Sequence, residues 1–341
     1  MDNTLSKIMI ETVVRKYLKE MKENPERSTR NLIDMALQFS EGGFQKIFFQ
    51  AAQQMMQNEN SPYYSLLRNL IFSVDTEHLI HFGMNLGYNS FTLGAAQIRK
   101  AEKKWGFHIP WSINFHIDSH RLSKTLTHYH AAITQGEALG IYTFLFFAND
   151  LTDDLIALVS SHPDSAFLLF CQPEHIDFDF LDNISEVTNL MLVIQYKENM
   201  ESLYQTIRSK GLLYSVYYPY SAKDCKEILN GDLFYSVQQF YPIFTILLAK
   251  PSCSDRLIAT IQKNAEQART EQYYQTFPWE FYLDNLLITQ IISDSSYSSW
   301  FDEDGILRDR TGTNFSDTAD LFSSPLFSLF QSAFPIKHSG Y

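Results

Sequence analysis

Two histidines and an aspartate alternate along one short segment near the middle of the chain. His116, Asp118 and His120 are separated by single residues, in a stretch that is typical of a β-strand. Alternate side chains of an extended strand point to one face, so the sequence predicts that the three lie together. Two imidazoles and a carboxylate suit Zn or Fe, and one hypothesis is a metal-dependent enzyme. The alternative is that these polar groups hydrogen-bond to one another and to water.

Further polar residues follow the later candidate strands. Asn149 and Asp150 follow the apolar segment 141–147, Gln172 follows the segment 166–171, and Gln195 ends the segment 190–195. Functional side chains of parallel barrels lie at the carboxyl ends of strands, where these residues are predicted to stand. The candidate ligand-binding residues are therefore His116, Asp118, His120, Asn149, Asp150, Gln172 and Gln195. For Asn149 and Asp150 we favour a helix N-cap, because Leu-Thr-Asp-Asp follows them.

The three cysteines give no sign of metal or disulfide chemistry. Cys171, Cys225 and Cys253 are widely separated, and their odd number argues against a disulfide framework. Cys171 ends an apolar run, which is typical of a buried thiol. The sequence contains no phosphate-binding glycine loop and no serine-nucleophile elbow.

Composition narrows the class of protein. The chain has 341 residues, of which 15% are aromatic, and a net charge of -12. This charge disfavours nucleic acid as a partner, because phosphate neutralisation requires clustered Lys and Arg. No apolar stretch approaches the ~20 residues of a membrane-spanning helix, and the beginning does not resemble a signal peptide. We expect a cytoplasmic protein that binds neither nucleic acid nor membranes.

The pattern of apolar residues changes at Pro110. Before it, apolar residues repeat at helical spacing; after it, short apolar runs alternate with amphipathic segments. Such alternation predicts parallel strands joined by helices, and about six units predict a partial barrel of the (β/α)6 kind. The candidate strands are Trp111–Ile117, Ile141–Phe147, Ala166–Cys171, Leu190–Gln195, Leu213–Tyr218 and Leu233–Gln239. A hairpin with its turn at Asp304-Gly305 is expected near the end of the chain.

Several short sequence segments, taken in order, resemble those of radical SAM proteins that carry a C-terminal SPASM-like extension. They are Trp105–Trp111, Gln135-Gly136 with Leu139–Tyr142, Phe167–Cys171, Val187–Asn189, Ser209–Leu212, Asp304-Gly305 and Ser324–Phe327. The resemblance implies a chain in three parts, built around a radical-SAM-type partial barrel. These are a helical module over residues 1–108, the barrel over 109–272 and a degenerate SPASM-like extension over 273–341.

The departures from that family concern its chemistry. The family's three cysteines, spaced C-x-x-x-C-x-x-C after strand one, hold a [4Fe–4S] cluster that binds SAM. Here His120-Arg121 leads directly into Leu122–Leu126, which contains no cysteine. The glycine motif G-G-E-P after strand two, which takes the amino group of SAM, is replaced by Phe147–Asp150, and a phenylalanine in place of glycine fills space. The segment after strand four and the auxiliary-cluster cysteines are likewise replaced, by Gln195–Glu198 and Leu307–Thr311.

Loss of the cluster site together with the SAM site implies a catalytically inactive member of the family. We expect no cofactor and no iron–sulfur cluster. The expected role is a binding or regulatory subunit for a protein, peptide or small molecule, and the expected partners are an active radical SAM relative or a peptide substrate. The alternative is the metal-dependent enzyme that would use His116, Asp118 and His120.

Overall fold

The computed structural model describes residues 3–38, 40, 43–293, 295, 297–315 and 320–336. The chain divides into two compact units, each made of two segments. Unit 1 comprises Met1–Met84 and Met191–Asp284, and unit 2 comprises Asn85–Leu190 and Asn285–Tyr341. Both contain parallel strands joined by helices, which confirms the predicted α/β class. No helix within the described ranges is both long and apolar enough to cross a bilayer.

Unit 1 begins with the helical module that the apolar spacing predicts. Its helices are α1 (Asn3–Met21), α2 (Pro25–Gln38), α3 (Gly43–Met55), α4 (Pro62–Ser73) and α5 (Thr76–Met84). Ser61 caps α4 by accepting a hydrogen bond from the backbone N–H of Tyr63, as the Ser-Pro pair predicts. Arg15 of α1 holds both carboxylate oxygens of Glu77 in α5, at 2.6 and 2.9 Å. The module is therefore tied together by caps and by a bidentate ion pair.

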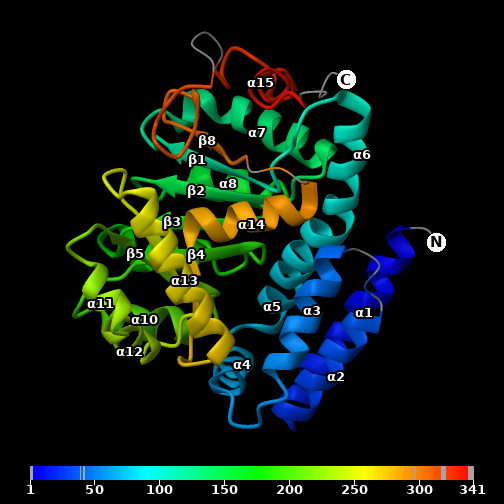
Figure 1. Cartoon of the computed structure of the whole chain (residues 1–341), viewed down its shortest axis with the longest axis vertical. Coiled ribbons are helices and arrows are strands. Elements are labelled where there is room, and N and C mark those ends of the chain that lie inside the picture. Colours follow the sequence, from blue (N-terminus) through cyan, green and yellow to red (C-terminus); the bar gives the residue numbers. More distant parts are fainter. Residues whose placement is uncertain are drawn as a thin grey trace. The chain divides into compact units, whose positions relative to one another are not determined.

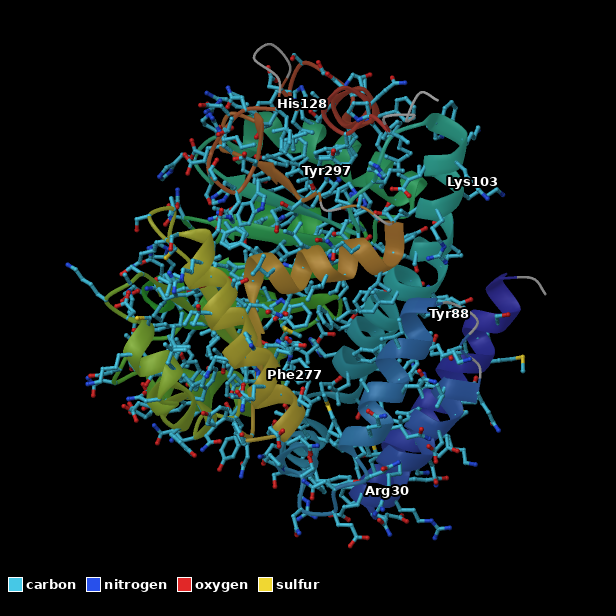
Figure 2. The ribbon with its side chains drawn as sticks, viewed as in Figure 1. Arg30, Tyr88, Lys103, His128, Phe277 and Tyr297 are labelled. Carbon is cyan, nitrogen blue, oxygen red and sulfur yellow. The ribbon has the colours of Figure 1, made fainter. Side chains whose placement is uncertain are left out.

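The strands of unit 1 are all parallel. In spatial order they are β7 (Phe277–Glu280), β6 (Phe244–Ala249), β5 (Tyr214–Tyr220) and β4 (Leu190–Gln195). The connecting helices are α10 (Glu201–Ser209), α11 (Cys225–Leu229), α12 (Asp232–Gln238) and α13 (Asp255–Glu271). Phe277, labelled in Figure 2, lies 5.7 Å from the ring of Tyr63, so β7 packs against the helical module.

The predicted sixth strand is wrong. Leu233–Gln239 was expected to be extended, but α12 covers almost all of it. Leu233, Phe234 and Val237 are fully buried, and this spacing places them on one face of a helix. The sixth strand is β6, whose apolar run begins at Phe244, and β7 follows it as a strand that the sequence did not predict.

Unit 2 carries the first three strands of the predicted barrel. β1 (Ser112–Ile117), β2 (Thr143–Ala148) and β3 (Ala166–Cys171) are parallel, with α7 (Leu122–Leu139) and α8 (Asp153–Ser160) between them (Figure 1). Phe115 and Phe146 point to the face that α7 covers, where Tyr129 lies 5.5 Å from Phe115. The neighbouring residues of each strand point to the opposite face.

The C-terminal segment completes unit 2. β8 (Ser299–Phe301) pairs parallel to β1 and turns at Gly305 into the antiparallel β9 (Leu307–Arg308). The hairpin predicted at Asp304-Gly305 is therefore confirmed. The remaining elements are the π-helix η1 (Asn85–Gly94), α6 (Ala95–Trp105), the short η2 (Pro173–His175), α9 (Phe178–Asn183), α14 (Phe281–Ser293) and α15 (Leu326–Ala333).

Candidate functional site: an aromatic row at the carboxyl ends of strands

Four rings stand side by side near the carboxyl ends of the strands in unit 2. We call Trp300, His116, Phe147 and Phe170, one from each of β8, β1, β2 and β3, the aromatic row. His116 stacks on Phe147 at 4.9 Å and lies 5.4 Å from Trp300. Phe147 stacks on Phe170 at 4.3 Å. Because His116 is level with Phe147, and Phe147 with Phe170, strand register places these rings on one face.

Burial within the row is uneven. Trp300 and Phe170 are buried, whereas His116 and Phe147 keep part of their surface exposed. Burial lowers the pKa of His116, and the carboxylates of Glu303 and Asp302 oppose that effect without reversing it. The imidazole therefore favours its neutral form more than a solvated histidine does.

This pKa shift predicts a pH dependence of stability. The folded chain binds a proton at His116 less readily than the unfolded chain, so stability is lost as pH falls below about 6.5. His116→Phe keeps a ring in the row and removes the titration. We expect the unfolding free energy of this variant, measured in urea, to gain on the wild type between about pH 7.5 and about pH 5.5. Parallel pH profiles of the two proteins would contradict this assignment.

The expected alignment of His116, Asp118 and His120 on one strand face is wrong. β1 ends at Ile117, and the chain then turns, with the N–H of Arg121 donating to the carbonyl of Asp118 at 3.0 Å. The Asp118 carboxylate accepts the N–H of His120 at 3.0 Å, which stabilises the turn. The side chain of His120 is 86% exposed, and its imidazole lies 3.5 Å from the carboxylate of Asp150. In the described ranges no three His, Cys, Asp or Glu side chains form a metal-binding group.

Asn149 and Asp150 do not cap the following helix. The N-cap of α8 is Thr152, so the favoured interpretation of these two residues is wrong. The backbone of Asp150 exchanges hydrogen bonds with the hydroxyl of Ser119, at 2.6 and 3.2 Å. The Asn149 amide donates to the Glu303 carboxylate at 3.2 Å. Asp150 thus joins the end of β2 to the end of β1, and Asn149 joins the end of β2 to the turn between β8 and β9.

The two glutamines lie in different units. Gln172 is exposed after β3, where its carbonyl accepts the N–H of His175 at 3.1 Å. Gln195 ends β4 in unit 1 and accepts a hydrogen bond from the Tyr217 hydroxyl at 3.5 Å. Neither belongs to the aromatic row. Their role as ligand-binding residues stays a prediction.

Cys171 is buried, as its position at the end of an apolar run predicts. All three cysteines are free, and Cys253 is also buried. Burial raises the pKa of the Cys171 thiol to about 12, so it stays protonated at neutral pH. A protonated thiol is a poor metal ligand.

A buried carboxylate in unit 1 escaped the sequence analysis. Glu280, at the end of β7, is fully buried, and its pKa is raised to about 7 by burial. It accepts hydrogen bonds from the N–H of Leu283 at 2.7 Å and from the hydroxyl of Tyr220 at 3.2 Å. In return its own N–H donates to Asp284, which is paired with Arg269 at 2.6 Å. This reciprocal pattern is a helix cap for α14, which is a structural role.

Fold and site together define an α/β protein whose parallel strands end in a row of aromatic rings. No family model matches the chain, and no curated protein matches it. Among solved structures, the crystal structure of Streptococcus suis SuiB is similar, with a TM-score of 0.49 and 9% sequence identity. The similarity covers 94% of this chain and 81% of that chain. At this identity, function has to be argued from the residues of the site.

Proposed function

We propose that this chain is a binding subunit on a radical-SAM-like scaffold, without cluster or SAM chemistry, and that its partner is a peptide or a protein. The observation that carries the proposal is the position of Phe147. Its ring lies between His116 at 4.9 Å and Phe170 at 4.3 Å, at the end of β2. This is where the family resemblance places the glycine motif that receives SAM.

A stacked ring at that position leaves no space for a ligand that needs close approach to the backbone. Glycines permit such approach because they carry no side chain. Phe147 could move away only by giving up its contacts with three neighbouring rings, those of His116, Phe170 and Trp300. Aromatic pairs are worth about 0.5–1.5 kcal/mol each beyond their buried area. The aromatic row therefore supports the proposal that the ring of Phe147 fills the space in which SAM would bind.

The sulfur inventory supports the same proposal. A [4Fe–4S] cluster that binds SAM needs three thiolates close together. The segment after β1 supplies a turn at Asp118–Arg121 and then α7, without a cysteine. Cys171, at the end of β3, is a buried thiol whose raised pKa keeps it protonated. We therefore infer that a scaffold that keeps its strands but lacks the thiolate ligands of the cluster acts by binding a partner.

Calorimetric titration with SAM tests the proposal. We expect the wild-type chain to bind SAM with a dissociation constant weaker than about 1 mM. Phe147→Gly is the matched variant, because it removes the ring and restores the residue type of the motif. If the Phe147→Gly variant binds SAM and the wild type does not, the ring of Phe147 is what prevents SAM binding in the wild type. A wild-type dissociation constant near about 1 µM would overturn the proposal.

A further inference from the structure

We propose that His130 and His162 bind a divalent transition-metal ion of the zinc type, at the amino ends of the strands of unit 2 and away from the aromatic row. This site goes beyond the proposed function and does not depend on it. It is carried by the distance between two imidazole nitrogens, by a carboxylate behind one of them, and by a loop whose backbone is held by buried amides.

The two imidazoles meet from different elements. His130 lies on α7, and His162 lies in the loop of residues 161–165 between α8 and β3. The Nδ1 atom of His130 is 3.1 Å from the Nε2 atom of His162. Two nitrogens that bind one tetrahedral Zn²⁺ at about 2.0–2.1 Å are about 3.3 Å apart. The observed separation is therefore close to that of two ligands of one ion.

A carboxylate lies behind His162. Glu137, two turns after His130 on α7, is 3.3 Å from the Nδ1 atom of His162. The Glu137 carboxylate also accepts the hydroxyl of Ser165 at 2.7 Å, which fixes its orientation. The Nδ1–H of His162 therefore donates to Glu137, and the lone pair of this ring stays on Nε2, the atom that faces His130. A carboxylate behind a ligating histidine is the usual means of orienting such a ligand.

The proton between the two imidazoles can be replaced by the ion. Without metal, the Nδ1–H of His130 donates to the Nε2 atom of His162. When an ion binds, that proton moves to the Nε2 atom of the His130 ring, so both ligands stay neutral. Burial, together with the neighbouring imidazole of His162, lowers the pKa of His130. This favours the neutral ring that a metal requires.

Buried asparagines hold the loop that carries His162. The amide nitrogen of Asn189 lies 3.0–3.2 Å from the carbonyl oxygens of Val159, His162 and Ser165. From η1, the amide of Asn85 donates to the carbonyl of Ser165 at 3.0 Å. Both asparagines are buried. The backbone around His162 is thus fixed from two sides, and a ligand on a fixed backbone needs little reorganisation to bind.

The site borders solvent. Ser161 is exposed and His130 is partly exposed, whereas His162 is buried. The Ser161 hydroxyl is 3.3 Å from the Nδ1 atom of His130, so this oxygen or water completes the coordination. Imidazole nitrogens suit zinc and its neighbours in the transition series, whereas Mg²⁺ prefers oxygen ligands. Two protein nitrogens are fewer than the four ligands of a structural zinc site, so we expect moderate affinity.

A zinc titration tests the site. The full chain is treated with EDTA, desalted and titrated calorimetrically with zinc chloride at about pH 7.5, where both imidazoles are neutral. We expect about one Zn²⁺ per chain with a dissociation constant below about 100 µM, and no comparable binding of Mg²⁺. Weaker zinc binding would overturn the inference. Equal binding of the two ions would also overturn it, because it would reflect attraction to the net charge of -12.

Three variants locate the ion. His130→Gln removes one ligand from a partly exposed position, and we expect it to weaken zinc binding at least about tenfold. Glu137→Gln keeps both imidazoles but removes the orienting charge, and we expect a loss of about tenfold. His128→Gln is the matched control on the same helix, because its ring contacts Phe322 at 5.6 Å (Figure 2). Zinc binding that is unchanged in His130→Gln, or lost equally in His128→Gln, would contradict the site.

A fourth variant addresses the other ends of the strands. There the imidazole of His120 lies 3.5 Å from the carboxylate of Asp150. If zinc is lost in His120→Gln and kept in His130→Gln, the ion binds at the carboxyl ends of the strands, and the inference is overturned. The exposed position of His120 and the partly exposed position of His130 allow both variants to fold.

Discussion

Replacing Gly140 by alanine is expected to destabilise the protein by about 2–5 kcal/mol, because two independent costs combine at this position. Gly140 ends α7 with a φ of +101°, in the region that residues with a side chain rarely adopt. A Cβ atom there would lie 2.6 Å from the carbonyl oxygen of Gly94 and 2.9 Å from the backbone nitrogen of Ile98. Backbone atoms cannot rotate away as a flexible side chain does, so helix α6 would have to move from α7.

Gly106→Ala is the matched control for this prediction. Gly106 ends α6 with a φ of +73°, but a Cβ atom added there meets nothing within 4 Å. It therefore carries only the conformational cost, about 1–2 kcal/mol. Urea unfolding of both variants measures the difference between them. Equal losses of unfolding free energy would contradict the close approach of α6 and α7 at Gly140.

The first five strands could be predicted because burial leaves a local signal in the sequence. β3 and β4 are runs of consecutive apolar residues, and their predicted bounds, Ala166–Cys171 and Leu190–Gln195, match the structure. The sixth prediction failed because Leu233–Gln239 is also apolar and short. In such a segment, a strand and the buried face of a short helix have similar composition. Gly231, with a φ of +88° just before α12, was the available signal for a new helix.

The candidate site was predictable only in part. His116 and Phe147 were identified as individual residues, since each ends a recognisable strand. Their contacts with each other and with Trp300 depend on strand register, which connects segments far apart in the sequence. Asp118 and His120 were placed on the strand because alternation was extended past Ile117. The Asp118 carboxylate instead accepts the N–H of His120, a local hydrogen bond that competes with the extended conformation.

The measurement that tests the central claim most directly is the iron content of the chain after anaerobic reconstitution with iron and sulfide. The claim is that this scaffold binds a partner without a cluster. After desalting, we predict well under about one iron per chain, because three close thiolates are required to hold the cluster. Cys225→Ser is the control, since Cys225 is the free cysteine that is not buried, and it should carry the same residual iron as the wild type. A brown wild-type protein with about four irons per chain and broad visible absorption would contradict the account.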